Sequence, residues 1–551
     1  MNYNKSDKII INRLNMTLVD FDQKKSNINL NRVAFIFVII FFFIVLYSTR
    51  VIYLSSKTLH KNLYQISKIN RADIVDRNGD YISKSVYTSN LGIDPRLIKD
   101  KKKLLLKLQY TFPNKDLSEI KKKIYGQKFF YVEKKIIPEE YQQLKLLGEK
   151  SIRLEKKITR IYPDKNLFSH VVGQIDEDNN GISGLEQSFD QKLKDGRDKL
   201  VLTLDKELQF IIRNELLNSQ KIFKNVGGAG ILMNINNGEI LSLVSIPDFN
   251  LNSRKLISDN NYINRATKGV YELGSVFKSF TIAAGLNYDL ISPEYMFENI
   301  ERKMKCGGRV ISEYDENLPK DLSVEDILVY SSNIGSVKIG QLVGQEKLKS
   351  FLKQIGVLNQ LNFDIEEIGK PIPFTWRDCK LKTVSYGHGI TTTPIQLAKG
   401  YAILANGGYE IRPTLIKKDI YESKKKRILK KNVSSQMNNI FRKVVTHGTA
   451  SLSDVEGYEV GGKTGTAQIV ENGVYTNKKI NTFASVFPTT DPKYVLVILL
   501  EDTKLSKDYV YKYRNKPGSF KGTPFNTAGW TSVEITGKII DKIGPILATK
   551  Y

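Results

Sequence analysis

The segment Glu272–Phe280, ELGSVFKSF, contains a serine and a lysine whose spacing suits nucleophilic chemistry. Ser275 precedes Lys278 by three residues, and residues three apart on a helix lie on the same face, one turn apart. A lysine amine in this position could accept the proton of the serine hydroxyl, provided that burial or nearby positive charge keeps the amine neutral. A structural alternative stays open, because a serine at this point also caps a helix.

Two later segments contain polar residues that could complete such a site. Ser331–Asn333 (SSN) precedes the run IGSVKIG, and its structural alternative is a polar turn that opens a helix. Lys463–Thr466 (KTGT) follows two glycines. A glycine in a strand lets a ligand or another backbone approach closely, and the lysine and threonines beside it could bind a carboxylate. Its structural alternative is an edge strand with a bulge.

In this order and at these separations, the three segments resemble the SxxK, SDN and KTG motifs of penicillin-binding proteins and class A β-lactamases. The middle motif reads SSN here, as it does in many penicillin-binding proteins. The sequence is therefore identified as a member of the penicillin-binding transpeptidase family. Leu273 departs from the family's pattern, because proline is usual at that position.

The resemblance extends over about residues 30 to 535 and beyond the three motifs. SYGHGITTTPIQLAKGYAILANGG (385–408) resembles the family's segment between the second and third motifs. RADIVDRNG (71–79), RIYP (160–163) and GISGLEQSFD (181–190) resemble the N-terminal module of class B members, which have one membrane anchor and no glycosyltransferase domain. GISGLEQSFD and EDILVYSSNIG are most similar to the division-specific, septal branch, and the elongation-specific transpeptidase is the nearest competitor.

The resemblance implies a peptidoglycan D,D-transpeptidase that cross-links stem peptides ending in D-Ala-D-Ala through a serine acyl-enzyme, without a metal or organic cofactor. Ser275 would attack, Lys278 would accept its proton, and the backbone amides of Ser275 and Thr466 would stabilise the oxyanion. Ser331 and Lys463 would pass a proton to the departing D-alanine. The expected catalytic residues are Ser275, Lys278, Ser331, Asn333 and Lys463, and the expected substrate-binding residues are Thr464, Gly465 and Thr466.

Two other functional classes remain open. A β-lactamase or carboxypeptidase would transfer the acyl group to water, but the single anchor and the large N-terminal module argue against this class. A β-lactam sensor or inactive scaffold would not need the intact set Ser275, Lys278, Asn333 and Lys463. The products of acyl transfer would distinguish the enzymes, and the site of accumulation in the cell would distinguish the septal from the elongation role.

A long apolar segment near the start of the chain predicts a transmembrane helix. Val33–Leu54 contains fifteen apolar residues without a break, VAFIFVIIFFFIVLY, and its 22 residues would span about 33 Å as a helix. That length crosses a hydrocarbon core of about 30 Å. No small-x-small cleavage site follows, so we expect an uncleaved anchor. Basic residues in the polar segment 1–32 predict that this tail is cytoplasmic.

Two regions follow the anchor. Residues 55–220 contain RADIVDRNGDYISKSV, which predicts a strand, an Asn-Gly turn and a strand, but no catalytic constellation, so we expect a pedestal or dimerisation module. Residues 221–545 begin with an apolar hairpin at 230–246 and end with strands at 458–501, with helical segments between. This order predicts an α+β transpeptidase domain with an antiparallel sheet flanked by helices.

Composition excludes some functions and leaves others open. The net charge is +26, yet lysine and arginine are spread along the chain, which argues against a nucleic-acid partner and is compatible with anionic lipid headgroups. No CxxC or Cys/His cluster indicates a zinc site. Whether Cys306 and Cys379 pair is not decided by the sequence, and neither are the acceptor amine and the oligomeric state.

The family also implies where the protein acts and with what. We expect a single-pass protein of the inner (cytoplasmic) membrane, with its catalytic domain on the periplasmic side. The expected partners are peptidoglycan stem peptides, β-lactams, a membrane-embedded glycan polymerase and other division proteins.

Overall fold

The computed structural model describes residues 30–68, 71–196, 198–253, 259–418, 426–471, 473–522 and 524–551. Residues 1–69 and 70–551 form two compact units, which are described separately below. The predicted cytoplasmic tail, residues 1–32, lies outside the described residues except where the first described helix begins.

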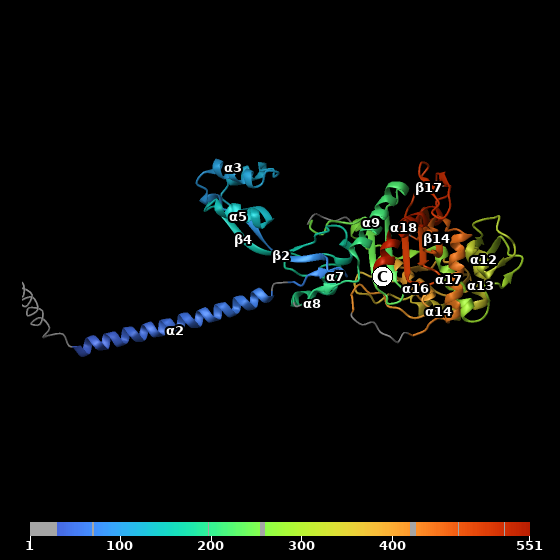
Figure 1. Cartoon of the computed structure of the whole chain (residues 1–551), viewed down its shortest axis with the longest axis horizontal. Helices are drawn as coiled ribbons and strands as arrows, with labels where there is room; N and C mark the ends of the chain where they lie inside the picture. Colours follow the sequence, from blue (N-terminus) through green and yellow to red (C-terminus); the bar gives the residue numbers. More distant parts are fainter. Residues whose placement is uncertain are drawn as a thin grey trace, which may run out of the picture. The chain divides into compact units, whose positions relative to one another are not determined.

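The first unit contains the helix α2 (Leu30–Lys68) (Figure 1). By length and composition, its stretch Asn31–Ser55 could cross a membrane, and none of its most apolar window is buried by protein. A helix that is apolar on all sides and uncovered by protein is suited to lipid. The predicted helix at 33–54 is confirmed. It extends past Leu54 because residues 55–68 contain no proline or glycine that would end it.

The second unit begins with a module built on one mixed sheet. β1 pairs antiparallel with β2 across the Asn78-Gly79 turn, as predicted, and parallel with β5. β2 also pairs with β3 and β4. The strands are β1 (Ile74–Val75), β2 (Tyr81–Ile93), β3 (Phe130–Ile136), β4 (Ile152–Ile161) and β5 (Leu200–Val201). The helices are η2 (Pro95–Leu97), α3 (Lys101–Thr111), α4 (Ser118–Ile124), α5 (Pro138–Leu146), α6 (Ser169–Val172), α7 (Gly184–Ser188) and α8 (Asp190–Asp195).

This module has two hydrophobic cores. At its base, Ile74, Ile82 and Leu200 belong to the same buried cluster as the predicted transpeptidase domain (the catalytic region). Where β2, β3 and β4 carry α3, α4 and α5, a separate cluster forms, with Leu104 and Leu144 among its fully buried members. The long strands β2 and β4 run through both parts, so one continuous pair of strands connects the two cores.

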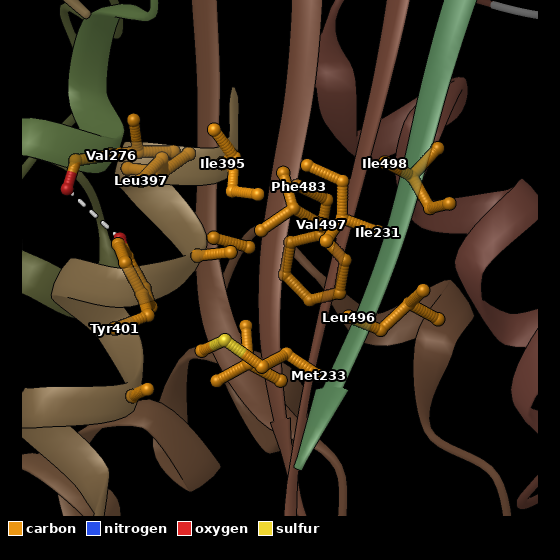
Figure 2. Close-up of a cluster of buried hydrophobic side chains, with 14 of the residues drawn as sticks. Ile231, Met233, Val276, Ile395, Leu397, Tyr401, Phe483, Leu496, Val497 and Ile498 are labelled. Atoms are coloured by element: carbon orange, nitrogen blue, oxygen red, sulfur yellow. Dashed lines mark hydrogen bonds between the residues drawn. The ribbon is translucent and has the colours of Figure 1, made fainter. Parts of the chain in front are cut away.

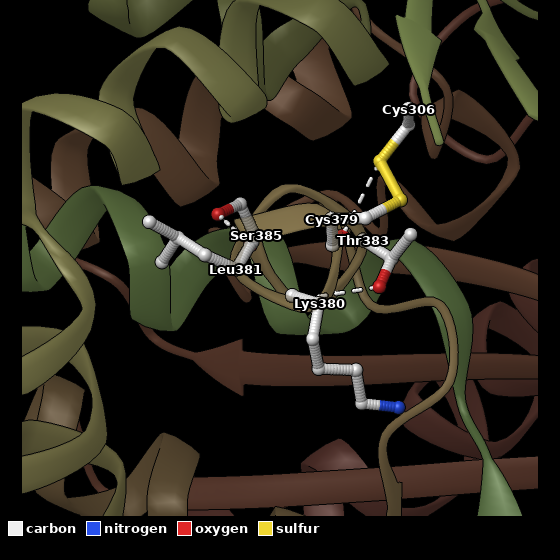
Figure 3. The surroundings of a disulfide bond; sticks show 6 residues. All are labelled: Cys306, Cys379, Lys380, Leu381, Thr383 and Ser385. Atoms are coloured by element: carbon white, nitrogen blue, oxygen red, sulfur yellow. Dashed lines mark hydrogen bonds between the residues drawn. A yellow bond between two sulfur atoms is a disulfide. The ribbon is translucent and has the colours of Figure 1, made fainter. Parts of the chain in front are cut away.

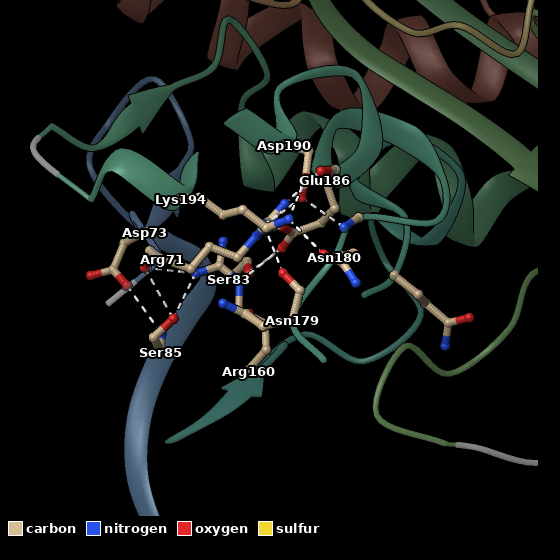
Figure 4. Close-up of polar contacts among 12 residues, drawn as sticks. Arg71, Asp73, Ser83, Ser85, Arg160, Asn179, Asn180, Glu186, Asp190 and Lys194 are labelled. Atoms are coloured by element: carbon tan, nitrogen blue, oxygen red, sulfur yellow. Dashed lines mark hydrogen bonds and ion pairs between the residues drawn. The ribbon is translucent and has the colours of Figure 1, made fainter. Parts of the chain in front are cut away.

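A buried ionic cluster joins three segments of the module (Figure 4). Arg71 Nε donates to Glu186 Oε2 at 2.5 Å, and Arg160 Nε donates to Glu186 Oε1 at 2.8 Å. Arg71 also pairs with Asp190 at 2.7 Å. The side chains of Arg71 and Glu186 are fully buried, which is tolerable only because each charge has a partner. The segments RADIVDRNG, RIYP and GISGLEQSFD therefore meet at one structural contact.

Glu186→Ala tests this cluster, because it leaves two buried guanidinium groups without their shared carboxylate. We expect the free energy of unfolding to fall by about 3–5 kcal/mol. Denaturant unfolding of the full chain would measure this loss. The exposed Glu177, changed to alanine as a control, should alter the free energy by less than about 0.5 kcal/mol. A loss below about 1 kcal/mol for Glu186→Ala would show that the cluster does not hold the module together.

The catalytic region contains a five-stranded antiparallel sheet of order β14-β15-β16-β6-β7. The early hairpin pairs with the late strands through β6 and β16, from Asn234 opposite Tyr494 to Gly227 opposite Glu501. This confirms the predicted sheet. Its strands are β6 (Gly227–Asn234), β7 (Ile240–Ile246), β14 (Gly461–Glu471), β15 (Val474–Phe487) and β16 (Tyr494–Glu501).

Helices cover both faces of this sheet (Figure 1). α9 and α18 pack together on β6, β7, β15 and β16, whereas α16 and α17 pack with the buried α11 against the sheet's other side. The helices are α9 (Lys206–Phe223), α10 (Asp259–Tyr262), η3 (Gly274–Phe277), α11 (Lys278–Asn287), α12 (Val324–Val329), α13 (Asn333–Val343), α14 (Gln345–Ile355), α15 (Asp378–Ser385), α16 (Pro394–Ala405), α17 (Lys431–Thr446), η4 (Ser451–Ser453), η5 (Ala528–Trp530) and α18 (Ser532–Lys550).

Short strands lie outside the main sheet and pair in twos. They are β8 (Tyr271–Glu272) with β13 (Thr391–Thr392), β9 (Met296–Phe297) with β12 (Leu322–Ser323), β10 (Lys303–Cys306) with β11 (Arg309–Ser312), and β17 (Val510–Lys512) with β18 (Ser519–Lys521). The predicted fold class, a membrane helix followed by a mixed module and a helix-flanked antiparallel sheet, is confirmed. The boundary at residue 220 stays a prediction, and α9, which spans it, packs on β6 and β7.

The core between α16 and the sheet fixes the turn that contains Ser275. Ile395, Leu397 and Tyr401 of α16 belong to the same buried cluster as Phe483 of β15, and Figure 2 shows Tyr401 directed toward Val276. The buried Tyr401 hydroxyl donates to the Val276 carbonyl at 2.9 Å, so the packing of α16 holds η3 in place. The same hydroxyl lies 2.9 Å from Ser279 Oγ of α11, so a buried group that needs hydrogen-bond partners finds them in η3 and α11.

Candidate active site

Ser275 lies in η3, half-buried, at the wall of a cleft of about 530 Å³. The other residues that line the cleft include members of the second and third motifs, among them Ser331, Asn333, Thr464 and Thr466. Lys278 and Lys463 lie beneath this surface and are fully buried. The structure therefore brings together every residue that the sequence predicted for the site.

Close backbone contact joins the first and third motifs. A Cβ atom on Gly465 would lie 2.2 Å from the Leu273 carbonyl oxygen, and one on Gly274 would lie 2.8 Å from the Thr466 carbonyl oxygen. Gly274 also has a φ of +63°, which favours glycine. Only glycine at these two positions lets β14 pass directly against η3. The backbone at Thr466 is thereby held beside the backbone at Ser275.

The three motifs converge on one hydroxyl group. Lys278 Nζ donates to Ser331 Oγ at 3.0 Å, to Asn333 Oδ1 at 2.8 Å, and to the Ser331 carbonyl. Lys463 Nζ donates to the same Ser331 Oγ at 2.9 Å. Within the described residues, no hydrogen bond joins Lys278 Nζ to Ser275 Oγ. In unliganded sites, catalytic hydrogen bonds are often long and shorten only when substrate binds.

The second motif is both a helix-opening turn and part of the site. Ser331 has a φ of +62°, a strained conformation for a residue with a side chain. The next residue caps α13, because Ser332 Oγ accepts from the Gly335 amide at 2.9 Å. The structural alternative for this segment is therefore correct as local structure, and the strained residue at the turn presents its hydroxyl to the two lysines.

Burial changes the ionisation of both lysines. It lowers the pKa of Lys278 to about 7, against the opposing effect of the Glu313 carboxylate. It also brings the pKa of Lys463 well below the usual range, and the positive charge of Lys278 lowers this pKa further. Since like charges in a dry site repel strongly, a neutral lysine is available near neutral pH. This meets the condition for Lys278 to act as a base.

The third motif lies on β14, which is an edge strand of its sheet, so the edge-strand alternative is also correct as a description of local structure. The hydroxyl groups of Thr464 and Thr449 lie 2.8 Å apart, and Thr466 Oγ1 accepts from the Ala528 amide at 3.0 Å. The register shift of β14 lies beyond the motif, between Gln468 and Val470. The unpaired backbone of an edge strand can accept an extended peptide as a further strand.

Sequence reasoning missed one wall of the cleft. Glu272, Tyr386, His388 and Tyr475 line it together. Tyr475 donates to Glu272 Oε1 at 3.0 Å, and the His388 ring stacks 5.0 Å from the Tyr475 ring. Burial lowers the pKa of His388. Glu272 and His388 stand in segments that resemble the family, but only tertiary contact brings them to Tyr475.

The two cysteines form a disulfide bond (Figure 3). Cys306 of β10 and Cys379 of α15 have Cα atoms 5.2 Å apart. The bond attaches the β10–β11 hairpin to α15, whose Ser385 carbonyl accepts from Thr281 of α11 at 2.9 Å. The sequence left open whether the two cysteines pair; they do, and the bond links two segments beside the cleft.

Among the described residues, no group of three or more metal-ligating side chains comes together.

Comparisons with known proteins find two matching families and several relatives. Residues 228–518 match the family described as the penicillin binding protein transpeptidase domain, and residues 67–218 match the penicillin-binding protein dimerisation domain. The chain is 29% identical over 497 residues to the probable peptidoglycan D,D-transpeptidase FtsI of Caulobacter vibrioides, covering 87% of this chain and 82% of the relative. It is 26% identical over 479 residues to the peptidoglycan D,D-transpeptidase FtsI of Escherichia coli, covering 80% of each.

A solved structure shows the same fold. The penicillin-binding protein 3 of Mycobacterium tuberculosis, in complex with ampicillin, superposes with a TM-score of 0.66 at 21% sequence identity. The superposition covers 87% of this chain and 96% of that chain. The transpeptidase match spans more than half of the sequence, and its boundaries enclose all three motifs. The chain belongs to the penicillin-binding protein transpeptidase family.

Proposed function

We propose that the protein is the septal peptidoglycan D,D-transpeptidase of its cell, which cross-links stem peptides during division through an acyl-enzyme on Ser275. The observation that carries this proposal is the convergence of Lys278 and Lys463 on Ser331 beneath the cleft that Ser275 lines. The names of the FtsI relatives support the assignment to the septal branch.

In the first step, Ser275 Oγ attacks the carbonyl carbon between the two terminal D-alanines, and Lys278 accepts the hydroxyl proton. The neutral amine needed for this transfer is consistent with the lowered pKa of Lys278. The carbonyl oxygen gains negative charge in the tetrahedral intermediate. The backbone amides of Ser275 and Thr466, held side by side by the glycine contacts, are suited to stabilise that charge.

In the second step, the C–N bond breaks, and the departing D-alanine amine takes up the proton. The hydrogen bonds from Lys278 and Lys463 to Ser331 Oγ form a path for this proton. An amine from a neighbouring peptidoglycan strand then attacks the acyl-enzyme carbonyl. This attack forms the cross-link and releases Ser275, whose oxygen regains a proton.

Substrate binding falls to the second and third motifs. Thr464, Gly465 and Thr466 present the unpaired edge of β14 to an extended peptide. Because Thr466 Oγ1 accepts from the Ala528 amide, its own hydrogen is directed elsewhere and can be donated to the terminal carboxylate. The family resemblance implies that Asn333 binds the amide backbone of the substrate. Its Nδ2 and Oδ1 already have partners in Ser312 and Lys278, so this contact needs a shared hydrogen bond or a change of partner.

Among the described residues, one helix is long and apolar enough to cross a membrane. We infer that the catalytic region lies outside the cytoplasm. The basic residues of the N-terminal segment support this orientation. The disulfide bond also supports it, since such bonds persist in oxidising compartments. A glycan polymerase and other division proteins are the partners that we propose for the anchor and the N-terminal module. The elongation-specific role is the alternative, and localisation in dividing cells distinguishes the two.

Ser275→Ala tests the proposed function directly. We expect loss of covalent labelling by a fluorescent penicillin and loss of cross-linked product, since removing a catalytic nucleophile costs several orders of magnitude in rate, about 10⁶ in a studied serine hydrolase. Ser292→Ala, which changes an exposed serine just beyond α11, is the matched control and should label normally. Undiminished labelling of Ser275→Ala would place the nucleophile at another residue. Hydrolysis of the donor peptide without cross-linking would favour a carboxypeptidase.

Lys278→Arg separates the basic role of this residue from its charge. Arginine keeps the positive charge but is effectively never deprotonated, so acylation should be nearly as slow as in Ser275→Ala. The time course of penicillin labelling measures the rate, with the exposed Lys268→Arg as the control. Acylation at close to the unaltered rate would mean that Lys278 is only a structural cation.

A further inference from the structure

A buried carboxylate lies beneath the second motif, on a segment that has no motif of its own. Glu313 follows β11 and is 7% exposed. Its Oε1 accepts from Ser332 Oγ at 2.6 Å and from the Ile334 amide at 2.9 Å, and its Oε2 accepts from the Asn333 amide at 2.7 Å. All three donors belong to the second motif or to the residue directly after it.

These contacts supply hydrogen-bond acceptors, from outside the helix, for the backbone amides at the start of α13. The first amides of a helix have no partner within it, and a carboxylate at this end is favoured by both hydrogen bonding and the helix dipole. Glu313 binds two of these amides, and Ser332 Oγ binds the amide of Gly335. The position and direction of α13, with its first residue Asn333, thus depend on a side chain from the β10–β11 hairpin.

The same segment also holds the side chain of Asn333. Its Nδ2 donates to the carbonyl of Ser312, the residue before Glu313, at 2.8 Å. The Oδ1 atom is thereby turned toward Lys278 Nζ, at 2.8 Å. The Glu313 amide itself donates to the Arg302 carbonyl at 3.1 Å, and the disulfide at Cys306 attaches the hairpin to α15. The carboxylate therefore sits on a segment that is itself fixed.

We propose that Glu313 is the positioning residue of the second motif: it holds Ser331–Asn333 in the strained turn that presents Ser331 Oγ and Asn333 Oδ1 to Lys278. This inference rests on the proposed function, because it assigns a role in the acylation of Ser275. Glu313 acts through Ser332 and Asn333 and does not itself line the cleft.

The charge of Glu313 gives this role a distinct signature. The charged groups that face Lys278 are Glu313, which raises its pKa, and Lys463 of β14. The neutral groups around its amine are Ser331 and Asn333. Removing the Glu313 charge lowers the pKa of Lys278 further, so the amine stays neutral at more acidic pH. In a plot of acylation rate against pH, the acid limb is the range where the rate falls because Lys278 becomes protonated. This limb should therefore move to lower pH, whereas a loss of packing alone would reduce the rate equally at every pH.

The experiment compares Glu313→Gln and Glu313→Asp in the full chain, using the second-order rate of labelling by a fluorescent penicillin across pH. Glutamine keeps the shape but turns an amide group toward the N–H donors, so we expect acylation to slow about 10- to 100-fold on the plateau, with the acid limb displaced to lower pH. Aspartate keeps the charge but is one methylene shorter, so it should leave the limb in place and lose less rate. Glu316→Gln removes an exposed charge three residues away and is the matched control, with no expected change.

Thermal unfolding of each variant shows whether it is folded. A folded Glu313→Gln with unchanged rate and unchanged limb overturns the proposal, and so does a slower rate with an unmoved limb. If Glu313→Gln does not fold, Glu313→Asp decides: slower acylation with an unmoved limb is expected, and an unchanged rate overturns the proposal. Failure of the unaltered chain to label at Ser275 would instead overturn the proposed function, so the two failures are distinguishable.

Discussion

The burial of two lysine side chains against one serine hydroxyl is the constraint on which the site depends. Lys278 and Lys463 are fully buried, and both donate to Ser331 Oγ. Two charged ammonium groups in a dry site would be costly, and the carboxylate beside them, Glu313, is occupied by three donors of the second motif. The folded chain relieves this cost by favouring a neutral lysine, and a neutral lysine is the base that acyl transfer needs.

The rest of the catalytic region maintains this arrangement. Glycines at 274 and 465 let β14 pass against the turn of Ser275, and a hydrogen bond from Tyr401 to the Val276 carbonyl also holds that turn. The Cys306–Cys379 bond attaches the hairpin that carries Glu313 to α15. The N-terminal module is stabilised differently, by the ionic cluster around Glu186 and by the separate core where β2, β3 and β4 carry α3, α4 and α5. The chemistry and the membrane attachment therefore reside in distinct parts of the chain.

Features with a local signal could be predicted from the sequence. The membrane helix, the hairpin at 230–246, the late strands and the three motifs each depend on a short run of residues, and the structure contains all of them. Glu313, His388 and the disulfide could not be predicted, because their partners lie tens of residues away and no spacing rule connects them. Ser331 shows why structural and functional alternatives need not compete: the same turn opens α13 and presents the hydroxyl to the lysines.

The most direct test of the account is the ionisation of Lys278 itself. NMR of the full chain in detergent, with lysine labelled with ¹³C at Cε, would follow the titration of each resolved lysine. We expect a resonance that titrates near pH 7 and is absent from Lys278→Met, beside a resonance of Lys463 that also titrates below the usual range. Titration of every lysine near the usual value of about 10.4 would show that Lys278 stays charged at neutral pH, and it would contradict the role of this residue as the base.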